Sequence, residues 1–581
     1  KLSTYINEDY NYIYGENNFS KNFKNIKSYL KLFGYDSVMF TGSKKEFLGV
    51  NSGYFNPSGA SKDKLSNLTG VHLESCLCSS GKISLSSGEV RETYIILGYD
   101  DSIERINSEL NKLTCDKGKL NELYFDSLDN GKNKYKDFQI KTQDEYLDAI
   151  FNGWILHQNE NEKFLLSNSR HGELNSCVDL MEKCLIYNYT DSNKSKKTII
   201  RVFSNMYEDG GFKDKWSNLT KEFEINKSLY DLFWIVYIVV DYVNITGDFE
   251  ILDFEIKYMY DNECKKDINI GFSTLYDKCL KIINKAIVYD ENNNYKLNEN
   301  IKDVSTLLML SMVLNDFDKI LNHMNDEKNK VIFKKIKSLV MDLVKNNCFN
   351  GEFYINNLDD KINDKFYSDI YLLPQVLSLL CDDDESVCRK VIFSIEKYLV
   401  NKEVGFIREF FRKGSGFSKN CENIQNNKIL ALFVKALCKF NLNDSAYTYL
   451  NFMNPILKTI TRNSANVYRR EPYIIPSKIK FDNSNSFKIL NEDFSHVSSL
   501  FYRVVLEDII GFYFCKDGFY FNPCAPSNWN NYVIEYLRDE SFYKIIVRKG
   551  EFKSLKINGE KHVEKIIKFQ EKGTHIIDIT I

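Results

Sequence analysis

The stretch SLYDLFWIVYIVVDYVNITG, residues 228–247, decides the fold of this 581-residue chain. Its apolar residues cover more than one face of a predicted helix, as expected for a helix packed between two layers of other helices. The most apolar part, residues 232–243, is interrupted by Asp241 and is too short to cross a bilayer. We therefore predict a core helix of a helical domain and no membrane span.

Other helical runs surround this one between about Asp144 and Gly511, and short polar breaks separate them. No fixed-period repeat is visible, which weighs against a solenoid and favours a closed double ring of helices. Alternating apolar residues predict strands only before about Tyr99 and after about Gly511. Residues 81–99 have the pattern of a hairpin around Ser-Ser-Gly-Glu, and residues 512–523 that of a hairpin around Lys-Asp-Gly.

The composition is that of an ordinary globular protein, with 43% hydrophobic and 27% charged residues and a net charge of -3. No basic excess points to nucleic acid or to an anionic membrane. The 14 cysteines form no CxxC pair, and the chain begins without an apolar signal core, so we expect reduced thiols in a cytoplasmic protein. The seven histidines contain no HxxxH pair, and we expect no metal site.

A series of short motifs occurs in one order along the chain. They are KKEFLG (44–49), LSSGEVRETYIILGYDDS (85–102), NGWILHQ (152–158), DLFWIVYIVVDYVNITGDFEIL (231–252), NGEFY (350–354), VGFIREF (404–410), YRREPYII (468–475), YRVVLEDIIGF (502–512) and FNPCAPSNW (521–529). Together they resemble the cellobiose and chitobiose phosphorylases of glycoside hydrolase family 94, which also occurs as a domain of cyclic β-1,2-glucan synthases.

The resemblance implies a mixed, mainly α fold: an (α/α)6 barrel flanked by an N-terminal β-sandwich piece and a small C-terminal β domain. We expect the β-sandwich in residues 1–100, a helical linker in 101–143, the barrel in 144–511 and the C-terminal β domain in 512–581. The family's sandwich is longer than the segment that precedes Lys45 here, so the sandwich is expected to be truncated. A homo-oligomer or a second chain could complete it.

The resemblance also implies inverting phosphorolysis of a β-linked disaccharide or gluco-oligosaccharide. One carboxylic acid protonates the glycosidic oxygen while inorganic phosphate, the co-substrate, attacks the anomeric carbon from the opposite face. Because phosphate is itself the nucleophile, no second carboxylate and no cofactor are needed. The enzyme must supply a proton donor, a phosphate cradle and hydrogen bonds to the sugar hydroxyls.

The family's proton donor is the first Asp of an Asp-Trp-Asn-Asp-Gly motif, whose place falls here on YKLNENIKDVS, residues 295–305. The Trp and the Gly are missing, and the remaining carboxylates are Glu299 and Asp303. Glu299 lies between two Asn residues in a polar loop. Asp303 is more simply the N-cap of the next helix, and a helix N-terminus stabilises the ionised carboxylate, which is the wrong direction for a proton donor.

The family's phosphate- and sugar-binding positions are also altered. Gln425 is kept, Lys428 replaces a His, and Ser495 with His496 falls where the family has Thr-Gly. The family's sugar-binding Arg and Asp become Asn175 and Ser176, and an amide cannot reproduce the charge and fork of a guanidinium. Arg170 and His171, just upstream, could compensate. In another motif of the family, which contains acidic residues, this chain retains Lys227, Ser228 and Asp231.

We therefore expect a carbohydrate-binding or assembly subunit that has lost catalysis while keeping the family framework. An active phosphorylase with a displaced acid and a purely structural partner of another chain remain alternatives. For Trp154, Trp234 and Trp529 we favour core packing over sugar stacking. The resemblance further implies that Asn175, Asp231, Lys428 and Ser495 line one cavity at one end of the barrel.

Overall fold

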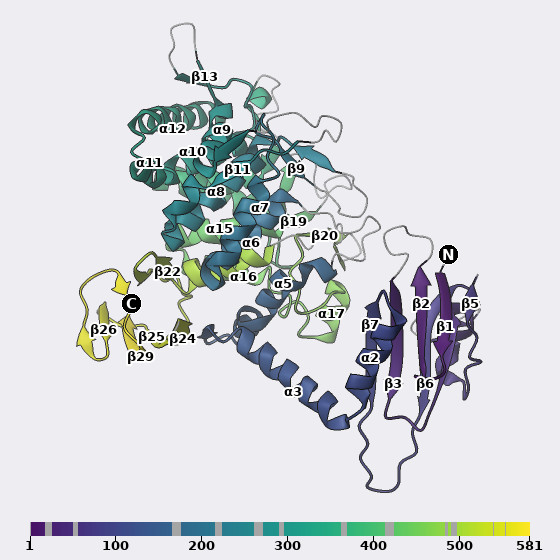
Figure 1. The fold of residues 1–581 in the computed structure, drawn as a ribbon. Coiled ribbons are helices and arrows are strands. Elements are labelled where there is room, and N and C mark those ends of the chain that lie inside the picture. Colours follow the sequence, from purple (N-terminus) through teal and green to yellow (C-terminus); the bar gives the residue numbers. More distant parts are fainter. Residues whose placement is uncertain are drawn as a thin grey trace. The chain divides into compact units, whose positions relative to one another are not determined.

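The computed structural model divides into two compact units, residues 1–134 and 135–581 (Figure 1). The residues that it describes are 2–17, 26–49, 56–71, 73–165, 176–214, 223–260, 271–289, 295–361, 369–412, 423–482, 486–489, 497–538, 540–551 and 553–581.

The first unit is a β-sandwich followed by helices. Its larger sheet has the strand order β5-β1-β2-β3-β7, and its second sheet pairs β4 with β6. The strands are β1 (Leu2–Asn7), β2 (Tyr12–Asn17), β3 (Lys27–Phe33), β4 (Ser37–Ser43), β5 (Gly70–Val71), β6 (Ser75–Lys82) and β7 (Tyr94–Asp100). The helices are α1 (Lys44–Leu48), α2 (Ile103–Thr114) and α3 (Lys117–Lys134), and a short 3-10 turn spans Ser58–Ser61.

Helix α2 starts where the sequence predicts it and covers the larger sheet. The Ser102 hydroxyl caps it by accepting from the Arg105 N–H. On its buried face Ile106 and Leu110 pack with Tyr12 and Tyr29 in a small core. Helix amphipathicity thus fixes which side of α2 faces the strands.

The predicted hairpin of residues 81–99 is wrong, although its turn is present. The Glu89 N–H donates to the Ser86 carbonyl across the Ser-Ser-Gly-Glu turn. Strand β6 nevertheless pairs with β4, while β7 pairs with β3 in the other sheet. The connection therefore crosses from one sheet of the sandwich to the other, a choice that the alternation of side chains within one strand does not encode.

The second unit is built on a closed ring of inner helices, as predicted. Each packs against the next in the order α6, α8, α10, α13, α15, α18, and α18 packs against α6 again. The inner helices are α6 (Cys177–Thr190), α8 (Leu229–Thr246), α10 (Val304–Asp316), α13 (Leu372–Cys381), α15 (Asn427–Lys439) and α18 (Val497–Arg503), and a π-helical turn (Val504–Ile509) extends the last.

An outer layer of helices alternates with the inner ring in sequence and packs against it. These helices are α5 (Ile155–Leu165), α7 (Ser192–Phe203), α9 (Leu275–Ile283), α12 (Glu327–Cys348), α14 (Glu385–Tyr398) and α16 (Asn443–Asn451). The double ring is an (α/α)6 barrel. Shorter helical segments are α4 (Glu145–Ala149) with a π turn (Ile150–Trp154), α11 (Asp318–Met324), α17 (Arg462–Tyr468) and 3-10 turns at Phe249–Asp253, Asn284–Ala286 and Leu358–Lys361.

Helix α8 is the stretch that decides the fold. Among the described helices it alone is long and apolar enough to span a membrane. Its side chains from Leu232 to Val243 are instead largely buried between α6 and α10. The Ser228 hydroxyl caps its start, and Gly247, with φ +70°, ends it in the left-handed conformation that favours glycine.

Short strands interrupt the helical region, so the prediction of strands only at the two ends is wrong. They are β8 (Phe138–Lys141), β9 (Phe212–Asp214), β10 (Glu224–Asn226), β11 (Glu255–Lys257), β12 (Phe272–Thr274), β13 (Ile287–Tyr289), β14 (Tyr295–Leu297), β15 (Asp369–Tyr371), β16 (Val400–Asn401), β17 (Phe406–Ile407), β18 (Phe410–Arg412), β19 (Ile424–Asn426), β20 (Lys478–Asp482) and β21 (Ser486–Ile489). Several form two-stranded ladders directly before a helix, and segments this short carry no readable alternation.

The C-terminal strands form the hairpin predicted for residues 512–523 and a six-stranded sheet. That sheet has the order β27-β26-β29-β25-β24-β8, so one edge comes from a strand that precedes the barrel. The strands are β22 (Phe512–Cys515), β23 (Gly518–Phe521), β24 (Asn531–Arg538), β25 (Ser541–Arg548), β26 (Ser554–Ile557), β27 (Glu560–Lys561), β28 (Ile567–Lys568) and β29 (Gly573–Thr580). Ring contacts join sheet and barrel in one core. Phe512 contacts Phe138 and Tyr536 of the sheet, and Phe138 contacts Phe151, which stacks on Tyr502 of α18.

Gly511 links the last inner helix to β22, and substituting it tests how tightly this junction is packed. Its φ is +80°, and a Cβ there would lie 2.2 Å from the Pro523 nitrogen. We expect Gly511→Ala to lower the free energy of unfolding by about 3 kcal/mol, from backbone strain plus overpacking. Gly351→Ala is the matched control, because its φ is +97° with nothing within 4 Å of the added carbon. Equal losses in urea unfolding would contradict the packing argument.

Candidate functional site

The inner helices begin at one end of the barrel, and several of their first turns carry polar side chains. Ser176, Ser228, Asp303 and Asn426 are the N-caps of α6, α8, α10 and α15, and each accepts a hydrogen bond from a backbone N–H of its own helix. Helix N-termini present positive partial charge and are suited to anions. We call this end of the barrel the N-terminal mouth.

A lysine and two carboxylates meet at this mouth from helices far apart in sequence. The Lys428 ammonium of α15 lies 2.8 Å from Glu182 Oε2 and 3.8 Å from Asp179 Oδ1, both on α6. The Trp234 indole of α8 donates to Glu182 Oε1 at 3.0 Å. Glu182 is buried, with 3% of its side chain exposed, so its charge is held by Lys428 and the indole together.

Tyr230 lies close to the charged side chains at this mouth. Burial raises the pKa of its phenol, and the nearby carboxylates of Glu182, Asp231 and Asp303 raise it further, while Lys428 lowers it. The Tyr230 phenol is therefore a neutral hydrogen-bonding group at neutral pH. Asp231, Lys428 and Asp303 lie in or next to the first turns of α8, α15 and α10, so they share one end of the barrel.

Asp231, one of the predicted binding residues, belongs to a polar chain that ties two helix starts together. Its carboxylate accepts from the Asn226 amide at 3.0 Å. The same amide reaches Asp214 at 3.5 Å, and Asp214 accepts from the Cys177 N–H at 2.6 Å. Asp231 thus supports the geometry of the mouth as well as adding negative charge to it.

Two other predicted binding residues have mainly structural partners. The Ser176 hydroxyl accepts from the Asp179 N–H at 3.4 Å as the N-cap of α6. Gln425 is fully buried, and both ends of its amide are engaged, since its oxygen accepts from the Ile407 N–H and its nitrogen donates to Asn427. A ligand-binding role does not fit this placement of Gln425.

The two candidate acids also lie in different surroundings. Asp303 Oδ2 accepts from the Thr306 N–H at 2.7 Å and from its hydroxyl at 2.6 Å, which confirms the predicted N-cap. Glu299 is exposed in a turn after β14. Neither carboxylate is fully buried, since Asp303 is half-buried and Glu299 is exposed.

The structure describes two of the four residues predicted to line one cavity, Asp231 and Lys428. Both lie in the first turns of inner helices, at the N-terminal mouth. Asn175, Ser495 and His496 lie outside the described residues, as do Arg170 and His171. The assignment of these residues to a ligand stays a prediction.

The tryptophans divide between core and surface. Trp234 and Trp529 are buried, 4% and 5% exposed, which confirms core packing for both. Trp154 is 42% exposed and stacks on Tyr473 with ring centroids 4.8 Å apart, so the prediction of core packing is wrong for it.

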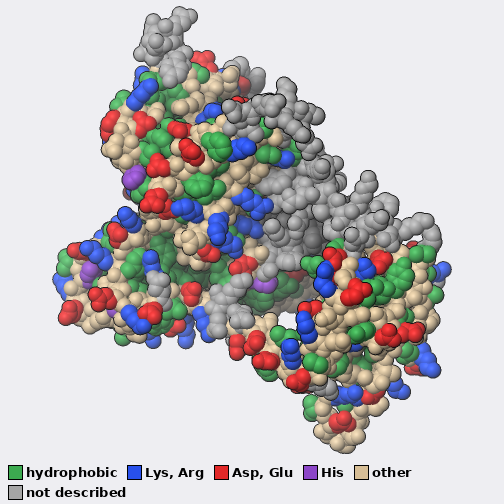
Figure 2. Space-filling model, viewed as in Figure 1, with side chains coloured by type: hydrophobic (Ala, Val, Ile, Leu, Met, Phe, Trp, Pro, Cys, Tyr) green, Lys and Arg blue, Asp and Glu red, His purple; other side chains and the backbone are tan. Residues whose placement is uncertain are grey.

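Sequence reasoning missed the acidic face of α6, where Asp179 and Glu182 meet Lys428. Their three-residue spacing puts them on one helix face, which is a readable signal, but nothing local shows which helix they meet. Within the described residues no group of three His, Cys, Asp or Glu side chains is arranged to hold a metal ion. On the face shown in Figure 2, charges of both signs are interspersed.

Comparison with known proteins agrees with this architecture. Residues 2–115 match the glycosyl hydrolase 94 supersandwich domain, and residues 131–511 match the glycosyl hydrolase 94 superfamily catalytic domain. A curated relative is the cyclic beta-(1,2)-glucan synthase NdvB of Rhizobium meliloti (strain 1021), 18% identical over 574 residues. That match covers 88% of this chain but only 20% of the synthase, so the chain spans about a fifth of its relative's length.

Among similar solved structures, a glucoamylase supports the fold. A bacterial glucoamylase in complex with acarbose has a TM-score of 0.53 at 10% identity, covering 87% of this chain and 74% of the glucoamylase. A putative kojibiose phosphorylase from the human microbiome has a TM-score of 0.44 at 12% identity, covering 98% and 74% of the two chains. With both domain matches spread along one (α/α)6 barrel and its β-sandwich, the chain belongs to the glycosyl hydrolase 94 family and is related to glycoside phosphorylases.

Proposed function

We propose that this chain is a carbohydrate-binding or assembly subunit that keeps the family framework but has lost phosphorolysis. The observation that carries the proposal is the ion pair between Lys428 and Glu182 at 2.8 Å, at the position where the resemblance implies the family's phosphate site. A lysine already neutralised by a buried carboxylate has little charge left for phosphate. The mouth is thereby adapted to neutral hydroxyl groups rather than to an anion.

The fate of the proton donor supports the same proposal. An acid must point at the glycosidic oxygen while it still carries its proton. Asp303 is engaged with Thr306 at the start of α10, and Glu299 is exposed. Two separate requirements of phosphorolysis, the acid and the phosphate site, are thus weakened together.

The expected ligand is a β-linked disaccharide or gluco-oligosaccharide. The Tyr230 phenol, Asp231 and the Glu182–Lys428 pair offer donors and acceptors side by side, and sugar hydroxyls need both. A cytoplasmic setting is part of the proposal, and the free thiols of the described cysteines support it. Assembly with a second copy or another chain would extend the same role.

The decisive assay measures phosphate release from α-glucose 1-phosphate with a panel of acceptors, and the reverse phosphorolysis of cellobiose, chitobiose and β-1,2-glucans. We expect no turnover in either direction, because no described carboxylate at the N-terminal mouth combines burial with a free proton-donating geometry. Turnover abolished by Glu299→Gln, Asp303→Asn or Glu182→Gln would overturn the proposal and identify the displaced acid.

Binding is measured separately by calorimetric titration of cellobiose. We expect binding by the unmodified chain and a loss on the order of tenfold in Lys428→Met, from a hydrogen bond to a charged group. Lys330→Met is the control, since Lys330 pairs with Glu327 on the outer helix α12. Absence of both binding and turnover would favour a purely structural partner.

A further inference from the structure

A second polar cavity lies at the other end of the barrel, where the inner helices finish. Its volume is about 710 Å³, within the range of small-molecule sites. The last turns of α10, α13 and α15 line it together with the segment after α18 and the loop after β23. Lys428 and Lys435 both belong to α15, and seven residues of helix put this cavity about 10 Å further along the barrel axis.

The cavity holds a buried acid with an unused oxygen. Asp508 is 6% exposed, and its Oδ1 accepts from the Tyr513 hydroxyl at 3.3 Å. Its Oδ2 is buried without a hydrogen-bond partner. A buried carboxylate oxygen that accepts no hydrogen bond raises the free energy of the folded protein. A ligand hydroxyl that donates to this oxygen would remove that penalty.

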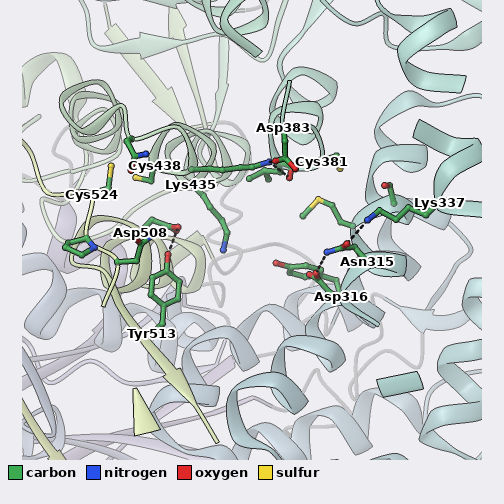
Figure 3. Close-up of a pocket in the computed structure, with 18 residues that line it drawn as sticks. Asn315, Asp316, Lys337, Cys381, Asp383, Lys435, Cys438, Asp508, Tyr513 and Cys524 are labelled. Carbon is green, nitrogen blue, oxygen red and sulfur yellow. Dashed lines mark hydrogen bonds and ion pairs between the residues drawn. The ribbon is translucent and has the colours of Figure 1, made fainter. Parts of the chain in front are cut away.

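A lysine projects into the same space. Figure 3 shows the Lys435 side chain between the Asp508–Tyr513 pair and the Asn315–Asp316 pair. Its ammonium lies 3.7 Å from Glu507, too far for a hydrogen bond, and 32% of its side chain is exposed although it rises from an inner helix. Lys435 can therefore donate to a ligand oxygen.

The opposite wall adds further groups that can bind hydroxyls. Asp316 Oδ1 accepts from the Asn315 amide at 2.9 Å, and the Asn315 oxygen accepts from Lys337 at 2.6 Å. Both Asn315 and Asp316 border the cavity, as do the aromatic ring of Tyr237 and the side chain of Met312. The lining therefore alternates acceptors, donors and small apolar surfaces.

These features select the chemical class of the ligand. The lining carries three carboxylates and three ammonium groups, so neither a simple anion nor a simple cation finds a lining of opposite charge alone; they are Asp316, Asp383 and Asp508, and Lys337, Lys435 and Lys439. A hydroxyl group donates to a carboxylate and accepts from an ammonium at the same time. We propose that this cavity is a second carbohydrate-binding site, which takes a neutral polyhydroxylated ligand of one or two sugar rings at the end of the barrel opposite Lys428.

The test isolates this cavity from the N-terminal mouth by titrating cellobiose, followed by saturation-transfer NMR. Asn315→Trp places a large ring at an exposed rim position, and Lys435→Met removes the central donor. We expect each to weaken binding at this site on the order of tenfold or more, both alone and in the Lys428→Met background. Asn322→Trp, an exposed asparagine on α11 that does not line the cavity, is the matched control and should bind unchanged.

The outcomes separate the proposals. Cellobiose binding that survives Lys428→Met and disappears when Asn315→Trp is added supports the second site. Unchanged cellobiose binding in the Asn315→Trp and Lys435→Met proteins overturns the second site. Complete loss of cellobiose binding in Lys428→Met alone also overturns it, provided that the thermal unfolding midpoint of this variant is unchanged. Inorganic phosphate should not displace the sugar, and displacement would replace the polyol assignment by an anion site. Thermal unfolding of every variant establishes that it is folded.

Discussion

Replacing Arg503 with methionine is expected to lower the free energy of unfolding of the barrel by about 3–5 kcal/mol, because it leaves buried charges without their partner. The Arg503 guanidinium binds Asp241 through two hydrogen bonds, at 2.7 and 2.9 Å, and Glu507 through one at 2.6 Å. It also donates to the Leu185 carbonyl and lies over the ring of Tyr189. The three charged side chains are at most 13% exposed.

Urea unfolding followed by circular dichroism measures the effect. Arg389→Met is the control, because Arg389 pairs with Glu385 on the exposed face of α14 and such surface pairs contribute about 0.5 kcal/mol. The double variant Arg503→Met with Asp241→Asn should recover part of the loss, since it removes one stranded carboxylate. A loss in Arg503→Met no larger than in the control would mean that the network is not stabilising the helices it joins.

The second large effect is a pH dependence centred on Asp508. The pKa of Asp508 is raised to about 6, mainly by burial and in part by Glu507, while Lys435 from α15, Arg503 and the Tyr513 hydroxyl from β22 oppose the shift. A folded-state pKa above the unfolded value of about 4 means that the protonated form is favoured by folding. Its contribution to stability is complete below about pH 4 and is lost as the pH rises through 6.

At about 1.4 kcal/mol per pH unit, this contribution amounts to about 3 kcal/mol. In Asp508→Asn the side chain at this position does not titrate. As the pH rises from 4 to 7, the free energy of unfolding of the unmodified protein should therefore fall by about that amount relative to the variant. Asp444→Asn is a control of opposite sign, because hydrogen bonds from Ser527 lower the pKa of Asp444 at the surface. Parallel pH profiles for the unmodified chain and Asp508→Asn would contradict the argument.

The fold could be predicted from the sequence where a local residue pattern is compatible with only one structural setting, such as a buried helix. The apolar residues on more than one face of α8 predict a buried helix, and the order of the family motifs predicts the barrel around it. The hairpin of residues 81–99 failed because both strands found partners elsewhere. The three-residue ladders before the helices were invisible because pairing with a distant segment, not periodicity, defines them.

The site was readable only in part for the same reason. The N-cap role of Asp303 follows from a few neighbouring residues, and it was predicted correctly. The pairing of Lys428 with Glu182 depends on how α15 and α6 approach across the barrel, and no local sequence feature contains it. The cavity around Asp508 is a property of helix ends and a returning loop together, which a linear pattern does not reveal.

The strand order of the C-terminal sheet has a consequence for how the protein is made. Strand β29, the last in the chain, lies inside the sheet between β25 and β26, while β8 at the edge precedes the whole barrel. During synthesis β8 emerges before the whole barrel, whereas its partner β24 and the inner strand β29 emerge after it. The sheet therefore cannot close until β29 has left the ribosome, and β8 waits with an unpaired edge while the barrel is made. Exposed edges of this kind invite pairing between chains, and a nascent chain held at this stage should therefore depend on chaperones to avoid aggregation.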